Sequence, residues 1–159
     1  MRVRLYRDED FESVWPLFLQ VERFYNKADL PSDDRIRAYL KSRVLAEDSG
    51  IRVALVFDGG TLLGMATFAI LHPGPGATGQ LYLKEIFVLE QHRGKGAGAA
   101  LMKFLAAYAL DQNCGRFDWT GDKSNPAGLD FYRALGLTPT DDKVYFRLSG
   151  EALKRLAQG

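Results

Sequence analysis

The first part of the chain alternates apolar and polar side chains over residues 3–7 and then changes to helical spacing. The alternation predicts a strand, and apolar residues that recur three and four positions apart predict a helix after it. That helix contains Pro16, so it either starts near Ser13, with the proline in its first turn, or is kinked. Ser32, followed by two aspartates, is a typical helix start and predicts a second helix that ends near Ala46.

The middle of the chain has the period of β-structure. Strands are expected at residues 52–57 and 61–71, joined by a tight hairpin turn at Asp58-Gly59-Gly60. Residues 72–79 are rich in proline and glycine and predict a loop. Another strand is expected at residues 80–89.

Helices and strands alternate in the second half of the chain. The expected elements are a glycine-rich loop at 94–98, a helix that ends near 113, a strand at 116–120, a helix at 126–135, a strand at 143–148 and a short helix at 151–157. Hairpins followed by a βαβ unit predict an α/β (α+β type) fold. Its central sheet should be mixed and mostly antiparallel, with helices flanking it. With 159 residues in total, we expect one domain over 1–159.

Charge and cysteine content exclude several classes of protein. The 21 Lys and Arg residues nearly balance the 20 Asp and Glu residues, which argues against a broad electrostatic grip on nucleic acid or an anionic membrane. Cys114 is the only cysteine, so an internal disulfide is impossible, and two isolated histidines do not make a metal site. No apolar run approaches the ~18 residues of a membrane span, and we expect a cytoplasmic protein.

The segment Gln91–Gly98 carries the strongest chemical signal. It reads Gln-His-Arg-Gly-Lys-Gly-Ala-Gly and joins a predicted strand to a predicted helix. Glycines allow a ligand to approach the backbone closely, and the free N–H groups of a helix start favour phosphate. Arg93 and Lys95 add local positive charge. We expect a phosphate site here, and a plain tight turn is the simpler alternative.

One established phosphate-binding pattern is absent and another is formally present. The P-loop pattern Gly-x-x-x-x-Gly-Lys-[Ser/Thr] does not occur. A dinucleotide-binding pattern reads Gly94-x-Gly96-x-x-Ala99, with Asp118 as a candidate ribose-binding acid near the end of the next strand. The upstream hairpin and the single βαβ unit make this the less favoured alternative.

Two motifs resemble those of the GNAT superfamily of N-acetyltransferases. Arg93-x-x-Gly96-x-Gly98 matches its Arg/Gln-x-x-Gly-x-Gly/Ala loop. Residues 125–137 resemble its Asn-x-x-x-x-x-Phe-Tyr-x-x-x-Gly-Phe segment. Both motifs fall about 30 residues apart in one βαβ unit, and the element order is similar over nearly the whole chain.

The spermidine/spermine (diamine) acetyltransferase-like subgroup is the most similar. Leu81-Tyr82-Leu83 and the ending from Tyr145 to Leu156 resemble it, and the subgroup's dimers imply a possible homodimer. Those enzymes carry two adjacent acids where this chain has Lys84-Glu85. A lysine there would repel a polycation, which disfavours a polyamine acceptor.

The resemblance implies acetyl-CoA as cosubstrate, a small-molecule primary amine as acceptor and no metal. Backbone amides of the loop would bind the pyrophosphate, and the preceding strand would bind the pantetheine arm. The implied acetyl-CoA-binding residues are Ile86, Phe87, Val88, Arg93, Gly94, Lys95, Gly96, Ala97, Gly98 and Asn125. The thioester is expected between this strand and the strand at 116–120.

Glu85 is the candidate general base. An alkylamine with a pKa of about 10.4 must lose a proton before it attacks. Strict alternation makes Glu85 the only charge on one strand face, whose other members are Leu81, Leu83 and Phe87. A structural carboxylate is the alternative, and bulk solvent or a bound water could also take the proton.

Tyr132 matches the tyrosine that many members of the resembling family place beside the CoA sulfur as general acid. The alternative is a packing residue with a satisfied hydroxyl. The candidate acceptor-binding residues are Glu22, Tyr25 and Glu85, since acidic and aromatic groups suit an ammonium. The functional alternative is a protein that binds acyl-CoA as a sensor and transfers nothing.

Overall fold

A computed structural model describes residues 1–25 and 30–158. The chain divides into two compact units, residues 1–120 and 121–159, which are described here one after the other.

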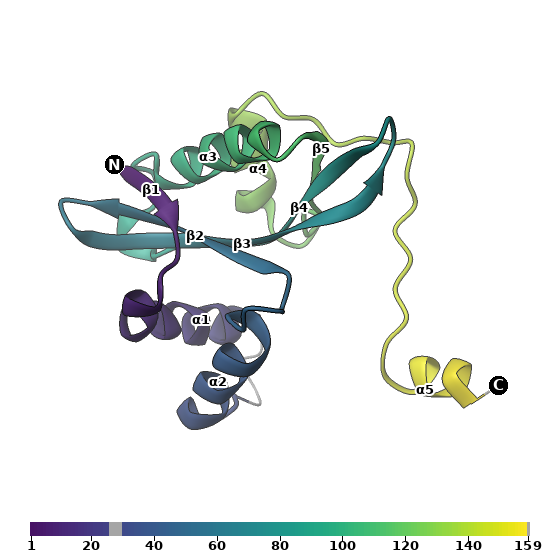
Figure 1. The fold of residues 1–159 in the computed structure, drawn as a ribbon, viewed down its shortest axis with the longest axis horizontal. Coiled ribbons are helices and arrows are strands. Elements are labelled where there is room, and N and C mark those ends of the chain that lie inside the picture. The colour runs from purple at the N-terminus through teal and green to yellow at the C-terminus, as the bar shows by residue number, and fades with distance from the viewer. Residues whose placement is uncertain (26–29, 159) are drawn as a thin grey trace. The chain divides into compact units, whose positions relative to one another are not determined.

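A five-stranded mixed sheet forms the centre of the first unit (Figure 1). Its strands are β1 (Arg2–Leu5), β2 (Ile51–Asp58), β3 (Thr61–Gly74), β4 (Thr78–Val88) and β5 (Cys114–Asp118). They lie in sequence order; β1 to β4 pair antiparallel and β5 is parallel to β4. This confirms the expected fold class.

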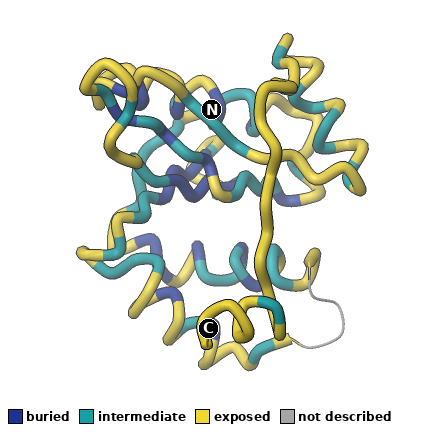
Figure 2. The backbone as a smooth tube through the Cα atoms, turned by 90° about the vertical axis from the view of Figure 1, so that its right-hand side faces the viewer, coloured by how far each residue is buried: buried dark blue, intermediate teal, exposed yellow. Residues whose placement is uncertain are grey.

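Helices cover both faces of this sheet. The helices of the first unit are α1 (Phe11–Tyr25), α2 (Asp33–Tyr39), which continues as a π-helix over Leu40–Val44, and α3 (Ala97–Asp111). Val14 and Leu17 of α1 pack on Leu55 and Met65 of the sheet. On the other face, the ring of Tyr108 in α3 meets Phe68, with 5.3 Å between ring centroids. Figure 2 shows that the buried residues concentrate where these layers meet.

The start of α1 depends on an ion pair rather than on proline placement. A 3₁₀ turn at Asp8–Asp10 leads directly into α1 at Phe11, so Pro16 lies inside the helix and not in its first turn. Asp10 is buried and accepts two hydrogen bonds from the Arg4 guanidinium, at 2.6 and 2.7 Å. Its carboxylate also accepts from the backbone N–H of Arg7 at 2.8 Å. Strand β1 is thereby fastened to the entry of α1.

The prediction of a loop at residues 72–79 is wrong for most of that segment. Strand β3 continues to Gly74 and β4 begins at Thr78, so only a three-residue turn at 75–77 separates them. The register shifts between Leu71 and Gly74. Such an irregularity lets a sheet accommodate a proline that cannot donate to the ladder.

The prediction that Glu85 shares a strand face with Leu83 is wrong, because β4 contains a bulge. Residues 67 and 68 of β3 pair with Glu85 and Leu83, which leaves Lys84 as the extra residue. Paired side chains share a face, so Leu83 lies with Phe68 on the α3 face, whereas Glu85 and Phe87 lie on the α1 face. Strict alternation, which placed all of them together, fails because a bulge shifts the parity of the strand.

The second unit contains α4 (Pro126–Ala134) and α5 (Gly150–Gln158). The prediction of a strand at residues 143–148 is wrong, since this segment has no regular secondary structure. Its Val144, Tyr145 and Phe146 side chains are 77%, 64% and 86% exposed. Their composition favours a strand, but a strand also needs a neighbour to complete its hydrogen bonds.

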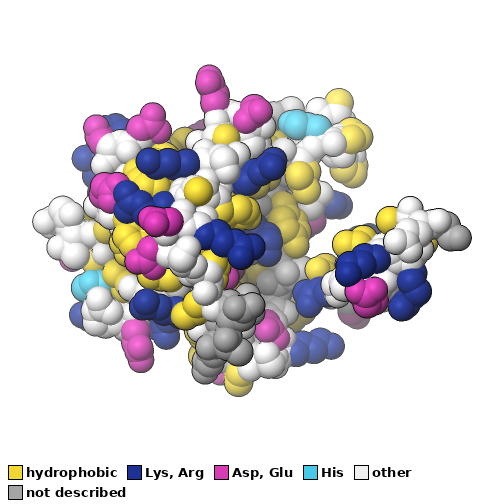
Figure 3. Space-filling model, turned by 90° about the horizontal axis from the view of Figure 1, so that it is seen from below, with side chains coloured by type: hydrophobic (Ala, Val, Ile, Leu, Met, Phe, Trp, Pro, Cys, Tyr) yellow, Lys and Arg dark blue, Asp and Glu magenta, His cyan; other side chains and the backbone are white. Residues whose placement is uncertain are grey.

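Two surface properties follow from the composition. Figure 3 shows acidic and basic side chains interspersed over one face of the molecule, as the near-balance of charges predicts. Within residues 1–25 and 30–158, no helix combines the length and apolar character that a bilayer crossing requires.

Candidate functional site

The glycine-rich loop forms the N-terminal cap of α3. Gly96 is the N-cap residue, with φ of 86°, and Gly94 has φ of 71°. Both lie in the left-handed region that only glycine adopts without strain. The first N–H groups of a helix have no intrahelical partner and carry the positive end of its dipole. The loop therefore presents a backbone anion site, as the sequence predicts.

The two basic side chains of the loop bind backbone carbonyls, one at the end of β4 and one in the loop itself. Arg93 donates from Nε to the carbonyl of Val88 at 3.0 Å, and its guanidinium lies 5.8 Å from the ring centroid of Phe87. Lys95 donates from Nζ to the carbonyl of Gln91 at 3.1 Å. Both charges lie beside the helix start, and both side chains brace the turn. The predicted residues from Arg93 to Gly98 thus form the turn before α3 and the first two residues of that helix.

Strand β4 continues beyond its pairing with β5. The parallel ladder covers Gly79–Tyr82 and ends where Tyr82 lies opposite Asp118, while β4 runs on to Val88. Among the described residues, the edge of 83–88 that would face β5 has no ladder partner. This stretch contains Ile86, Phe87 and Val88, and a strand edge without a ladder partner suits an extended amide-bearing ligand.

The point where the two strands separate is fixed by side chains. Gln80 donates to Asp118 at 2.8 Å and accepts from Arg116 at 2.7 Å, and the Arg116 guanidinium pairs with Asp118 at 2.8 Å. Asp118, the candidate ribose-binding acid of the dinucleotide alternative, is therefore engaged in holding β4 to β5.

Glu85 and Tyr25 lie together although 60 residues separate them. The Tyr25 hydroxyl, at the end of α1, donates to Oε1 of half-buried Glu85 at 3.3 Å. Burial raises the pKa of Glu85 above its usual value of 4.5. The Tyr25 hydrogen bond, the Lys84 charge and the Ile86 amide oppose this increase. A carboxylate with a raised pKa is a better proton acceptor.

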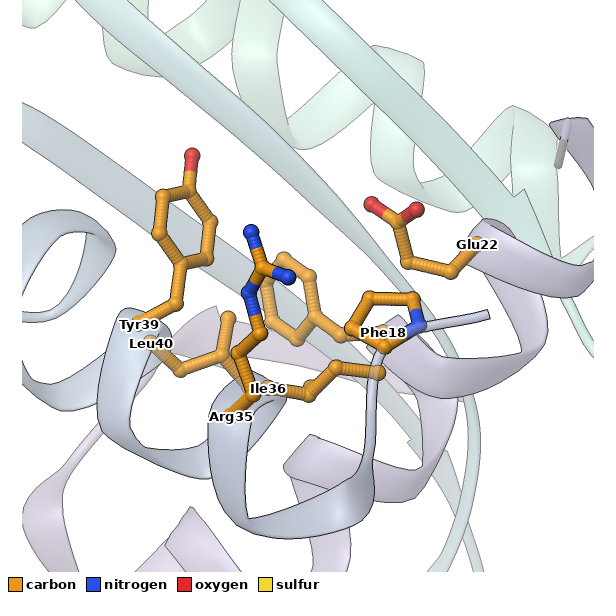
Figure 4. Close-up of a pocket in the computed structure, with 7 residues that line it drawn as sticks. Phe18, Glu22, Arg35, Ile36, Tyr39 and Leu40 are labelled. Carbon is orange, nitrogen blue, oxygen red and sulfur yellow. The ribbon is translucent and has the colours of Figure 1, made fainter. Parts of the chain in front are cut away.

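A pocket opens between α1 and α2 (Figure 4). It has a volume of about 220 Å³, and Glu22 is one of its lining residues; the others are Phe18, Pro31, Arg35, Ile36, Tyr39 and Leu40. Buried Ile36 and Leu40 form part of its apolar lining. Sequence reasoning found Glu22 but missed Arg35 and Tyr39. Their spacing of four residues on α2 places them on one helix face and was the available signal.

Asn125 and Tyr132 belong to α4, in the second unit. The Asn125 side chain caps the helix by accepting from the backbone N–H of Gly128 at 3.1 Å. Tyr132 is half-buried, and its ring centroid lies 5.1 Å from that of Phe131. Their approach to Glu85 and the glycine loop stays a prediction.

Two curated relatives of this chain are named as acetyltransferases. The chain is 36% identical over 85 residues to thialysine N-epsilon-acetyltransferase of Sus scrofa, covering 48% of this chain and 47% of that protein. It is 29% identical over 93 residues to L-ornithine N5-acetyltransferase of Arabidopsis thaliana, covering 58% and 41%. The chain thus spans about half the length of the curated relatives it matches.

Solved structures agree on the fold. An integron cassette protein from the mobile metagenome of V. cholerae is 34% identical, with a TM-score of 0.91 over 99% of this chain and 98% of that one. An aminoglycoside acetyltransferase from an uncultured soil metagenomic sample is 15% identical, with a TM-score of 0.73 over 93% and 95%. At that identity the likeness concerns the fold alone.

A match between this chain and a family sequence profile identifies its family. The sequence profile of the Acetyltransferase (GNAT) family matches residues 11–137, which include α1, the glycine loop and α4. The dinucleotide alternative thereby loses its support. The left-handed glycine turn at the start of α3, the extension of β4 beyond β5 and this match lead to one conclusion: the chain belongs to the GNAT family of acetyltransferases.

Proposed function

We propose that this protein transfers the acetyl group of acetyl-CoA to a primary amine of a small molecule. The observation that carries the proposal is the pairing of a backbone anion site at Gly94–Gly96 with a half-buried carboxylate, Glu85, on the strand that leads into that site. The first suits a pyrophosphate, and the second suits removal of a proton from an ammonium.

In the proposed reaction, the chain binds both substrates before transfer. The N–H groups from Arg93 to Gly98 bind the pyrophosphate, and the β4 edge at 86–88 and Asn125 bind the pantetheine arm. Glu85 accepts a proton from the ammonium, directly or through water. The neutral nitrogen attacks the thioester carbonyl, so that a C–N bond forms and the C–S bond breaks. The attacking nitrogen releases its second proton to solvent, Tyr132 donates a proton to the departing thiolate, and the Tyr132 phenolate regains a proton from solvent.

The names of the relatives support a particular kind of amine. Thialysine N-epsilon-acetyltransferase and L-ornithine N5-acetyltransferase are named for side-chain nitrogens of amino acids. Lys84 is exposed beside Glu85, and its charge disfavours a polycationic acceptor. We therefore favour an amine carried by a small molecule that is not a polycation.

The test is release of free CoA thiol from acetyl-CoA against a panel of small amines, with Tyr132→Phe measured beside the wild type. Turnover with one class of amine, reduced roughly 100-fold in the variant, is the expected result. CoA binding without turnover on any amine would favour the sensor alternative. Absence of CoA binding would refute the acetyltransferase proposal.

We further propose that residues 1–159 act as one domain and that the protein is a cytoplasmic homodimer. The buried thiol of Cys114 fits a reducing compartment. The exposed apolar side chains of Val144, Tyr145 and Phe146 support a surface that a second copy covers.

A further inference from the structure

The pocket between α1 and α2 has opposite charges above an apolar lining. Figure 4 shows the Arg35 guanidinium and the Glu22 carboxylate extending to the same side of the pocket, and Phe18 is one of its apolar lining residues. Glu22 comes from α1 and Arg35 from α2, so that the two charges flank the pocket from different helices. A small apolar cavity with a few convergent polar groups is a typical ligand site.

Neither charge is used to hold the described fold together. Within residues 1–25 and 30–158, neither Glu22 nor Arg35 has an ion-pair partner within 4.0 Å. The contrast on α2 is direct, because Arg37 donates two hydrogen bonds to the Glu12 carboxylate, at 2.9 and 2.5 Å. One arginine of the helix thus fastens α2 to α1, while its neighbour two positions earlier points into the pocket.

The pocket residue Glu22 and the residue that contacts the proposed base, Tyr25, lie about one turn apart on α1. Glu22 precedes Tyr25 by three residues, which is one helical turn and about 4.5 Å of rise. Tyr25 in turn contacts Glu85 at 3.3 Å. Phe18, which also lines the pocket, is about two turns from Tyr25. A ligand held between Glu22 and Arg35 therefore lies on the side of α1 from which Tyr25 reaches Glu85.

We propose, on the basis of the acetyl transfer proposed above, that this pocket binds the α-amino acid end of a diamino acid acceptor. The Arg35 guanidinium binds the α-carboxylate, for which its planar fork is suited, and Glu22 binds the α-ammonium. The side-chain amine then reaches Glu85. In an extended four-carbon side chain this amine lies about 6 Å from the α-carbon, given single bonds of about 1.5 Å. Glu22 and Arg35 thus determine specificity, and the side-chain nitrogen is the one acetylated.

The first test uses acceptors that differ only in the group Arg35 is proposed to bind. Cadaverine is L-lysine without its carboxylate. We expect the wild type to favour L-lysine over cadaverine in kcat/KM, and Arg35→Gln to reduce that ratio roughly tenfold to a hundredfold, as for a lost charge-assisted hydrogen bond. Arg23→Gln, an exposed arginine of α1 outside the pocket, should leave the ratio unchanged.

The second test examines Glu22 in the same way. The compound 6-aminohexanoate is lysine without its α-amino group, so Glu22→Gln should weaken kcat/KM for L-lysine more than for 6-aminohexanoate. An unchanged lysine-to-cadaverine ratio in Arg35→Gln, or a wild type that prefers cadaverine, would overturn the inference while leaving acetyl transfer intact. If no amine is acetylated, calorimetric titration of L-lysine and cadaverine into the CoA-bound protein decides. Equal binding of the two would refute the pocket assignment.

Discussion

The hydroxyl of Tyr25, the last residue of α1, lies 3.3 Å from Oε1 of Glu85 in β4. This contact connects the helix that lines the pocket to the strand that leads into the glycine loop. It exists because the bulge at Lys84 turns Glu85 to the α1 face of the sheet. Without that bulge, the carboxylate would point toward α3, away from Tyr25 and Glu22.

The pH dependence of turnover should report Glu85. A base must be ionised, so kcat/KM should fall as the pH decreases through the raised pKa of Glu85. Tyr25→Phe removes a donor to the ionised carboxylate, which increases that pKa further and moves the acidic limb to higher pH. Glu85→Gln should reduce kcat roughly 100-fold or more and abolish this limb. The measurement is the pH–rate profile of each variant with one amine.

The control for this profile is Glu47→Gln, which removes an exposed carboxylate that lies outside β4 in the sequence. The acidic limb of its pH–rate profile should coincide with that of the wild type. A profile that keeps its acidic limb in Glu85→Gln would show that another group, or solvent, accepts the proton.

The backbone of the glycine loop should matter more than its charges. Gly96→Val places a β-branched residue at a φ of 86°, which costs about 1–3 kcal/mol of strain and rearranges the N–H groups that face the ligand. CoA affinity should fall about tenfold or more. Arg93→Ala leaves this geometry available and should lower affinity only a few-fold. Calorimetric titration with CoA measures both.

A matched glycine separates strain from ligand binding. Gly60, in the hairpin turn between β2 and β3, has φ of 88° and, like Gly96, open space where a Cβ would lie. Gly60→Val should lower the melting temperature and leave CoA affinity unchanged. Equal CoA affinity in Gly96→Val and Arg93→Ala would contradict a backbone-based site.

Local signals in the sequence predicted the turns and caps correctly. Gly59 and Gly60 form the expected hairpin turn, Ser32 caps α2, and Gly136 follows α4 with φ of 75°. Each of these depends on a few neighbouring residues and on the backbone freedom of glycine or a short polar side chain. The glycine loop was predictable for the same reason.

Features that depend on distant partners were not predictable in this way. The bulge at Lys84 is defined by its pairing with β3, and nothing in the β4 sequence alone shifts its parity. The pocket could not be read from one segment, because Glu22 and Arg35 line it from separate helices. The segment 143–148 has strand-forming side chains, but a strand requires a neighbouring strand, which composition cannot supply.

Asp10 should make stability depend on acidity. The Arg4 hydrogen bonds, with smaller contributions from the Arg7 amide and nearby charges, hold the pKa of this carboxyl below its usual 3.8, although burial acts against them. The stabilisation that ionised Asp10 gives the folded state is therefore complete above the unfolded-state pKa of about 3.9. This stabilisation is lost as the pH falls through the lower folded-state pKa. Asp10→Asn should destabilise the protein by about 3 kcal/mol at neutral pH, measured by urea unfolding.

Asp8 provides the comparison for Asp10. It lies in the same 3₁₀ turn but is exposed, so Asp8→Asn should change the free energy of unfolding by less than about 0.5 kcal/mol. If Asp10→Asn is equally mild, or if its effect persists unchanged at pH 2, the ion pair with Arg4 is not what fastens β1 to α1.

Self-association should depend on the exposed apolar segment of the second unit. If a second copy covers Phe146, burial of its side chain contributes about 1.5–3 kcal/mol, and Phe146→Asp should raise the dimer dissociation constant roughly tenfold to a hundredfold. Lys143→Ser, a change to an exposed polar neighbour, should leave it unchanged. Sedimentation equilibrium measures both constants. A wild type that stays monomeric at tens of micromolar would refute the dimer, and the exposed segment would then have to be covered within its own chain or by another protein.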